Sequence, residues 1–268
     1  MDCRPIGVFD SGLGGLTAVR ELKKRMPEEN VVYFGDTGRV PYGTRGRETI
    51  EMYAQQAMDF LQSKDVKMII AACGTVSSVA VNAISRLRIP FTGVVKPAAQ
   101  AAVKSTKTRC VGVIGTSATV NSGSFMRAVK ELDEGVEVFS KACPLFVPLV
   151  ENGFIEPDNE AANIICRTYL DELNGRNIDT LILGCTHFPL MAPIISSVMG
   201  EGVKLIDTGK EAVKAAWNIL KSRDMLNCSG KEGRHDYYVS DSVQNFKDMA
   251  WIFLGERVTD NIELVRLG

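Results

Sequence analysis

The sequence predicts an α/β protein whose strands alternate with helices around mostly parallel sheets. Short runs rich in β-branched and aromatic residues alternate along the chain with longer amphipathic segments, which is the order that stacked β-α units produce. Several of the short runs are apolar throughout, as expected for strands covered on both faces. The length of 268 residues is sufficient for one large domain or for two smaller ones.

The first predicted strand follows directly on the N-terminus, and the last ends near residue 240. In chain order, the predicted strands are 6–10, 30–36, 67–72, 91–95, 110–115, 136–139, 180–184, 204–207 and 236–240. The segments between these strands have the amphipathic pattern and the length of helices. Examples are 48–63, 123–132, 160–174 and 211–222.

The composition is that of a soluble globular protein without a strongly charged surface. Lys and Arg total 31 against 32 for Asp and Glu, which gives a net charge of −1 and excludes bulk attraction to nucleic acid or anionic lipid. The N-terminus lacks the apolar core of a signal peptide. The longest apolar run, 68–73, is too short to span a bilayer. We therefore expect a cytoplasmic protein with reduced thiols.

The seven cysteines are scattered along the chain. Their number is odd, neighbours in sequence are never closer than 19 residues, and no Cys-x-x-Cys pair occurs. This excludes a disulfide scaffold, and with only two histidines a zinc cluster is not expected. Any functional cysteine therefore acts singly, and most of the others are expected to be packing residues. The cysteines are Cys3, Cys73, Cys110, Cys143, Cys166, Cys185 and Cys228.

Two segments of the sequence resemble each other. In both 67–75 and 179–187, an apolar strand is followed by a cysteine, a threonine and a predicted helix. Two related α/β lobes would place these segments in equivalent positions.

Four unusual segments follow predicted strands, where ligands gather in open parallel sheets. In 10–15, glycines permit a tight turn and amides can face an anion, although the pattern is neither a dinucleotide motif nor a P-loop. A structural turn would be the better explanation of the glycines alone, but Asp10 and Ser11 favour a functional role. In 36–43, a proline and glycines are equally typical of a surface loop.

The other two segments carry Cys73 and Cys185 at strand ends, just before helices. Backbone amides there favour a thiolate over a thiol. A single cysteine in such a place is usually a small buried hydrophobe, but two in matching contexts favour chemistry. Asp10 and His187 could manage the protons of these thiols, although His187 alone could equally be structural.

Two thiols that face one small anionic pocket suit racemisation at an acidic carbon. One side removes a proton as thiolate while the other donates one as thiol. A redox disulfide would use the same two residues and stays open as an alternative.

Segments 6–17, 33–43, 71–75 and 184–190 closely resemble the cofactor-independent aspartate/glutamate racemase family, and within it the glutamate racemases of bacterial cell-wall synthesis. The resemblance extends in order over nearly the whole chain. It implies two pseudo-symmetric α/β lobes with mostly parallel sheets, and an active site in the cleft between them. It further implies a first lobe of 1–95 with 210–268, a second lobe of 96–209, and a homodimer.

The same resemblance implies roles for individual residues. Cys73 and Cys185 are the acid/base thiols, one on each face of the substrate, with Asp10 as partner of Cys73 and His187 as partner of Cys185. Glu151 resembles a carboxylate that supports His187, although a surface glutamate would look the same, and Asp36 is expected in a similar supporting position. The residues expected to bind substrate are Asp10, Ser11, Tyr42, Gly43, Gly74, Thr75, Thr186 and His187.

The sequence departs from the family pattern at Gly74, where most members have asparagine between the cysteine and the threonine. Glycine supplies an amide but no carboxamide, so one substrate contact worth about 1.5–3 kcal/mol is expected to be lost or replaced by water. Phe188 replaces a commoner tyrosine and Met191 a leucine, and both are expected to pack rather than react.

The resemblance thus implies interconversion of L- and D-glutamate without metal or pyridoxal phosphate, supplying D-glutamate for peptidoglycan. The expected partner is a small-molecule substrate, with neither nucleic acid nor membrane. Because of Gly74, a racemase of aspartate or another acidic amino acid is the nearest alternative. A noncatalytic amino-acid-binding protein is the alternative of another class.

Overall fold

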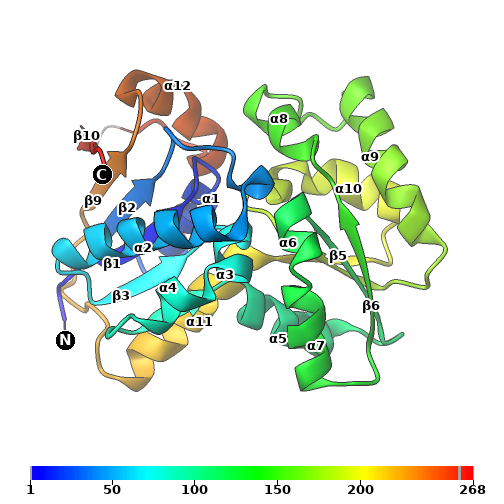
Figure 1. Cartoon of the computed structure of the whole chain (residues 1–268), viewed down its shortest axis with the longest axis horizontal. Helices are drawn as coiled ribbons and strands as arrows, with labels where there is room; N and C mark the ends of the chain where they lie inside the picture. Colours follow the sequence, from blue (N-terminus) through cyan, green and yellow to red (C-terminus); the bar gives the residue numbers. More distant parts are fainter. Residues whose placement is uncertain (1, 259–260, 268) are drawn as a thin grey trace.

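The chain forms two sheets of parallel strands, each covered by helices, that lie side by side (Figure 1). The computed structural model describes residues 2–258 and 261–267. The strand order is β10-β9-β2-β1-β3-β4 in the six-stranded sheet and β6-β5-β7-β8 in the four-stranded sheet, and all neighbouring strands run parallel. This confirms the predicted α/β class.

We call the six-stranded sheet and its helices the first lobe, and the four-stranded sheet and its helices the second lobe. The strands of the first lobe are β1 (Ile6–Asp10), β2 (Val31–Gly35), β3 (Met68–Ala71), β4 (Phe91–Gly93), β9 (His235–Val239) and β10 (Ile262–Leu264). Those of the second lobe are β5 (Cys110–Gly115), β6 (Glu137–Ala142), β7 (Thr180–Leu183) and β8 (Lys204–Asp207).

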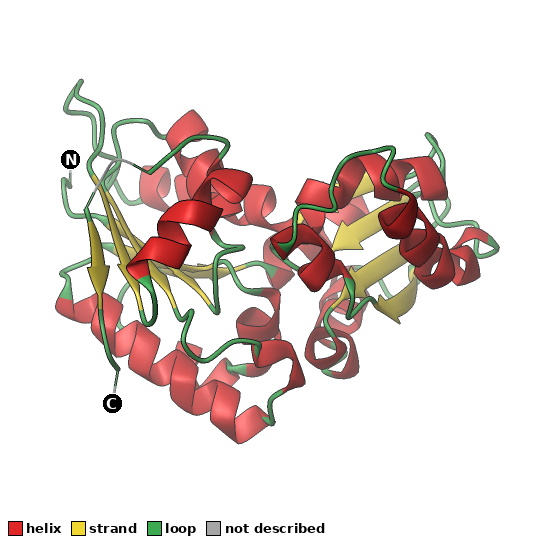
Figure 2. Cartoon of the chain, turned by 90° about the horizontal axis from the view of Figure 1, so that it is seen from above, coloured by secondary structure: helices red, strands yellow, loops and turns green. Residues whose placement is uncertain are grey.

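Helices cover both faces of each sheet, as the view from above shows (Figure 2). The first lobe has α1 (Leu16–Arg25), α2 (Arg47–Ser63), α3 (Gly74–Val79), α4 (Val81–Ser85), α11 (Thr208–Ser222) and α12 (Val243–Leu254), with the 3₁₀ turn η1 (Tyr42–Thr44). The second has α5 (Val95–Ser105), α6 (Ser117–Asn121), α7 (Ser124–Leu132), α8 (Phe146–Glu151), α9 (Glu160–Asn174) and α10 (Ala192–Met199), with η2 (Phe188–Met191).

Most predicted elements are present, some with the predicted bounds and others with ends shifted by at most three residues. The strand predicted at 136–139 is wrong in extent, because β6 is a partly exposed edge strand that continues through polar Ser140 and Lys141. Helix α11 begins before the predicted 211, because the Asp207 side chain accepts a hydrogen bond from the Lys210 amide and caps the first turn. Strand β10 was not predicted.

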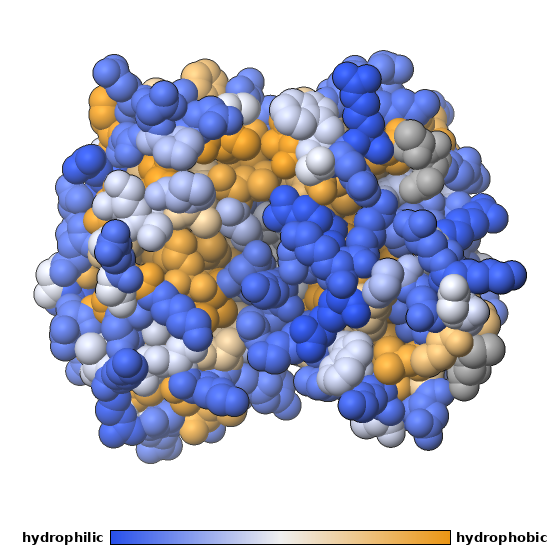
Figure 3. Space-filling model, turned by 180° about the vertical axis from the view of Figure 1, so that it is seen from behind, coloured by the Kyte–Doolittle hydropathy of each residue, from blue (hydrophilic) through white to orange (hydrophobic). Residues whose placement is uncertain are grey.

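The apolar core is continuous between the lobes. One face of the first sheet packs on α1, α11 and α12, and the same apolar cluster continues through α5 into the second lobe. The opposite face of the first sheet packs on α2 in a separate cluster. On the outer surface seen in Figure 3, hydrophilic side chains predominate and apolar ones gather mainly over the second lobe. Among the described residues, no helix is both long and apolar enough to cross a membrane.

All seven cysteines are free thiols, but they are not all packing residues. Cys143 and Cys166 are buried, as expected for small hydrophobes. For Cys3 and Cys228 the expectation of packing is wrong, because both are exposed.

A fully buried ion pair ties the amino-terminal edge of the first sheet together. The Lys67 ammonium lies 2.6 Å from Glu29 Oε2, and both side chains are almost completely excluded from solvent. Lys67 Nζ also donates to the carbonyl oxygens of Asp2 (2.6 Å) and Met225 (2.7 Å), while Glu29 Oε1 accepts from the Asn227 amide (2.9 Å). The pair therefore joins the N-terminal segment, β3 and the loop after α11.

We expect Lys67→Met to lower the free energy of unfolding by about 3–5 kcal/mol, because it leaves the Glu29 carboxylate buried without its cation. Chemical denaturation measures this loss. Arg234→Met is the control, since it breaks an exposed pair with Asp236 and should leave the transition nearly unchanged. Equal midpoints for the two variants would contradict the assigned role of Lys67.

Candidate active site

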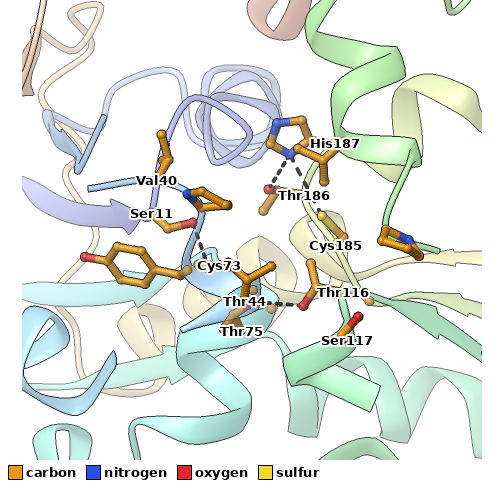
Figure 4. A pocket seen from close by; sticks show the side chains of 18 of the residues that line it. Ser11, Val40, Thr44, Cys73, Thr75, Thr116, Ser117, Cys185, Thr186 and His187 are labelled. Carbon is orange, nitrogen blue, oxygen red and sulfur yellow. Dashed lines mark hydrogen bonds between the residues drawn. The ribbon is translucent and has the colours of Figure 1, made fainter. Parts of the chain in front are cut away.

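The carboxyl ends of strands from both lobes converge on one pocket of about 260 Å³ (Figure 4). The arrangement follows from the parallel sheets, because all loops at the carboxyl ends of their strands lie along one edge. The first lobe contributes Ser11, Gly12, Val40, Pro41, Tyr42, Gly43, Thr44, Cys73, Gly74 and Thr75 to the lining. The second lobe contributes Thr116, Ser117, Pro144, Val147, Pro148, Glu151, Gly184, Cys185, Thr186 and His187.

Cys73 follows β3 and occupies the N-cap position of α3. Its Sγ donates a hydrogen bond to Ser11 Oγ at 3.3 Å. Burial, reinforced by the nearby Asp10 carboxylate, raises the pKa of the Cys73 thiol to about 12. At neutral pH this residue is therefore a thiol, able to donate a proton.

Asp10, the last residue of β1, lies behind the pocket wall rather than on it. Its Oδ2 accepts a hydrogen bond from the Gly12 amide at 2.9 Å, and its side chain is almost fully buried. Burial raises the pKa of the Asp10 carboxyl, an effect that the charge of His187 opposes. Asp10 thus lies within electrostatic reach of both Cys73 and His187.

Cys185 lies after β7, beside His187. The His187 Nδ1 atom is 3.9 Å from Cys185 Sγ and 3.4 Å from Thr186 Oγ1, while Nε2 is 3.0 Å from Glu151 Oε1. Burial opposes the charged imidazolium, but contacts with Cys185 and Glu151 outweigh it and raise the pKa of His187 to about 10. The second lobe therefore presents the Cys185 thiol next to an imidazole that is cationic at neutral pH.

The two lobes touch at backbone level around this pocket, at positions where only glycine fits. A Cβ atom on Gly74 would overlap the carbonyl oxygen of Gly184, and one on Gly14 would overlap Thr186 Oγ1 and crowd the His187 ring. Gly74 therefore does more than omit a carboxamide, since it allows the two cysteine loops to meet.

Hydroxyl groups also bridge the lobes. Thr75 Oγ1 of the first lobe is 3.0 Å from Thr116 Oγ1 of the second, as Figure 4 shows. Deeper in the interface, Ser124 Oγ donates to Ser78 Oγ at 2.8 Å. Uncharged contacts of this kind can part and re-form without leaving a bare charge behind.

The loop between β2 and α2 forms a third side of the pocket and is held by Asp36. This fully buried carboxylate accepts hydrogen bonds from Arg39 Nε (2.7 Å), Ser240 Oγ (2.7 Å) and the Tyr42 hydroxyl. Asp36 therefore does not line the pocket, but it fixes Tyr42, which does.

Of the residues predicted for the site, all but Asp10 and Asp36 line the pocket. Thr116 and Ser117 were missed, although they directly follow the strand predicted at 110–115 and the strand-end rule points to them. Phe188 and Met191 are buried, and Phe188 packs on Phe146 with ring centroids 5.1 Å apart, which confirms that they pack.

Residues 17–216 match the family model described as Asp/Glu/Hydantoin racemase. The glutamate racemase of Streptococcus gordonii is 45% identical over 268 residues, covering 98% of this chain and 100% of that protein. The glutamate racemase of Geobacter metallireducens is 43% identical over 261 residues, covering 97% of this chain and 96% of that protein.

Solved structures agree with these sequence relatives. The structure of glutamate racemase from Francisella tularensis in complex with D-glutamate superimposes with a TM-score of 0.93 at 36% identity, covering 100% of this chain and 99% of that chain. An aspartate racemase homologue from Pyrococcus horikoshii reaches a TM-score of 0.59 at 16% identity over 81% of this chain and 99% of its own, a likeness of fold alone.

We expect Glu151→Gln to lower the pKa of His187, because the amide removes one of the contacts that favour the imidazolium. The His187 pKa is about 10 in the folded chain and 6.5 ordinarily, so its stabilising effect is complete below pH 6.5 and is lost as the pH rises through about 10. The variant should lose this stabilising effect at a lower pH than the unmodified protein does. NMR titration of labelled histidine measures the change, with His235, the second of two histidines, as internal reference. An unmoved His187 titration would make Glu151 an ordinary surface residue.

Proposed function

This chain belongs to the Asp/Glu/hydantoin racemase family, and we propose that it interconverts L- and D-glutamate by proton transfer between two cysteine thiols. One observation carries the proposal: Cys73 of the first lobe and Cys185 of the second line the same small pocket, each beside its own ionisable partner. Two thiols that enter from different lobes can reach opposite faces of one substrate carbon.

In the proposed reaction, the thiolate of one cysteine removes the α-proton, and the electron pair of the C–H bond passes to the α-carbon and its carboxylate. The thiol of the other cysteine then donates its proton to the opposite face, which inverts the carbon. The base ends as thiol and the acid as thiolate, so the two cysteines exchange roles for the reverse reaction. No redox step occurs, and the proposal requires no metal or pyridoxal phosphate.

The unequal surroundings of the thiols fit this division of roles. Cys73 is held as a thiol by burial and Asp10, whereas Cys185 lies beside a cationic His187. In this proposal Cys73 is the thiol that donates a proton when the α-hydrogen of the bound enantiomer faces Cys185. Removal of that proton by Cys185, followed by donation of the Cys73 proton to the opposite face, would complete one inversion.

Polar groups around the thiols would hold the substrate. We propose that the side chains or amides of Ser11, Tyr42, Gly43, Gly74, Thr75 and Thr186 bind its carboxylates and amino group, together with Thr116 and Ser117. Hydrogen bonds to the α-carboxylate would stabilise the charge that develops as the proton leaves. In this proposal Asp36 acts through Tyr42, and Glu151 acts through His187.

Glutamate is the favoured substrate because the relatives that match nearly the full length are named glutamate racemases. The proposal extends to peptidoglycan synthesis as the use of D-glutamate, to a cytoplasmic location and to a homodimer. It also includes two domains, 1–95 with 210–268 and 96–209, which the division into two sheets supports.

We expect Cys73→Ser and Cys185→Ser each to lower the racemisation rate by about 10²–10⁴-fold, because each removes one acid–base group. In heavy water, each variant should still exchange the α-hydrogen of one enantiomer, and the two variants should favour opposite enantiomers. Proton NMR and circular dichroism follow exchange and inversion separately.

The control for these variants is Cys166→Ala, which alters a buried cysteine outside the pocket and should leave racemisation nearly unchanged. Full racemase activity in either serine variant would contradict the two-thiol mechanism. Absence of both exchange and inversion in the unmodified protein would leave only the amino-acid-binding alternative.

We further expect kcat/KM for L-glutamate to exceed that for L-aspartate by at least about tenfold. Aspartate is one methylene shorter, and a methylene in a fitted pocket is worth about 1–3 kcal/mol. Parallel assays of both amino acids measure the ratio. Faster turnover of aspartate would overturn the assignment of glutamate as substrate.

A further inference from the structure

Phe253 is an aromatic side chain of the first lobe that contacts His187 of the second. It lies on α12, which Figure 1 shows near the top of the first lobe, across from α8 of the second. The two ring centroids are 5.1 Å apart, and the ring planes are nearly perpendicular at 82°. Phe253 is fully buried, so this contact excludes water from one side of the imidazole.

The other contacts of His187 leave its ring orientation weakly determined. The distances from Nδ1 to Cys185 Sγ (3.9 Å) and to Thr186 Oγ1 (3.4 Å) are both long, and the Glu151 side chain that meets Nε2 is 42% exposed. Gly14 leaves room for the ring but supplies no side chain to hold it. The edge-to-face contact with Phe253 opposes rotation of the imidazole out of the plane in which each nitrogen faces its partner.

We propose that Phe253 is a positioning residue, which holds the His187 ring so that Nδ1 faces Cys185 and Nε2 faces Glu151. The proposal rests on the proposed function for its kinetic consequence, but not for the ring contact itself. Since Phe253 and His187 belong to different lobes, the histidine has its complete surroundings only when the lobes are together. The orientation of the His187 ring beside Cys185 therefore depends on contact between the two lobes.

The matched comparison is between Phe253→Leu and Phe246→Leu. Phe246 lies on the same helix and is equally buried, but it packs on Tyr33 and Tyr237, with ring centroids 6.3 Å and 5.7 Å away, rather than on His187. Both variants remove an aromatic ring from the core of the first lobe. A purely structural role for Phe253 therefore predicts the same outcome for both.

Histidine NMR gives a readout that does not depend on activity, because the chain has only two histidines. Phe253→Leu should shift the imidazole C–H resonances of His187, since the neighbouring ring current is lost, and should leave those of His235 in place. Phe246→Leu should leave the His187 resonances unmoved. A His187 spectrum that is unchanged in Phe253→Leu would overturn the proposal.

The kinetic readout is the division between kcat and KM for each enantiomer. Phe253→Leu should lower kcat by roughly tenfold or more with little change in KM, because misplacement of a catalytic partner mainly slows the chemical step. Phe246→Leu should keep kcat within about twofold. Equal kcat losses in the two variants would overturn the positioning role. If the unmodified protein does not racemise glutamate, the proposed function fails, while the NMR comparison still decides whether Phe253 orients His187.

Discussion

The active site depends on the close approach of two backbone segments, one from each lobe. Gly74 after Cys73 meets Gly184 before Cys185, and a side chain on Gly74 would overlap the Gly184 carbonyl oxygen, so in this chain the two loops would have to shift to admit one. Gly14 allows the same close approach beside His187. Because the main chains touch here, the two thiols enter one small pocket from opposite lobes. The reach of Asp10 to groups in both lobes follows from this juxtaposition.

The two halves of the site differ in the effect that sets the protonation of their ionisable groups. On the first lobe, burial raises the pKa of both Cys73 and Asp10, so that half favours neutral groups. On the second, contacts with Cys185 and Glu151 favour a charged His187 in spite of burial. A half in which burial holds Cys73 as a thiol therefore faces a half with a positively charged imidazole. In the proposed reaction the two cysteines exchange roles between the two directions, so this difference does not set the direction of net conversion.

The sequence predicted those parts of the structure that depend on local pattern. Apolar runs located most strands, and the strand-end cysteines pointed to the pocket because topology brings carboxyl ends together. What depends on the packing of distant segments was not predictable. Loss of the carboxamide at Gly74 was foreseen, but its contact with Gly184 needs the lobe arrangement. Asp10 was expected at the substrate and lies behind the wall, since its carboxylate turns back to the Gly12 amide. Phe253 and His187 lie far apart in the sequence and belong to no common motif, so their contact was not predictable either.

The C-terminal segment connects the fold to the site in two places. Strand β9 pairs with β2 in parallel, with Val239 opposite Gly35, so the next residues, Ser240 and Asp36, lie side by side. Ser240 donates to Asp36 and also accepts from the Gly38 amide at 2.9 Å, which holds the loop that carries Tyr42. Helix α12 then follows and brings Phe253 to His187. After the second lobe the chain returns to the first sheet, and this segment supports the pocket at two places, the loop that carries Tyr42 and the ring of His187. The site therefore requires the position of β9 beside β2 as well as the two cysteines.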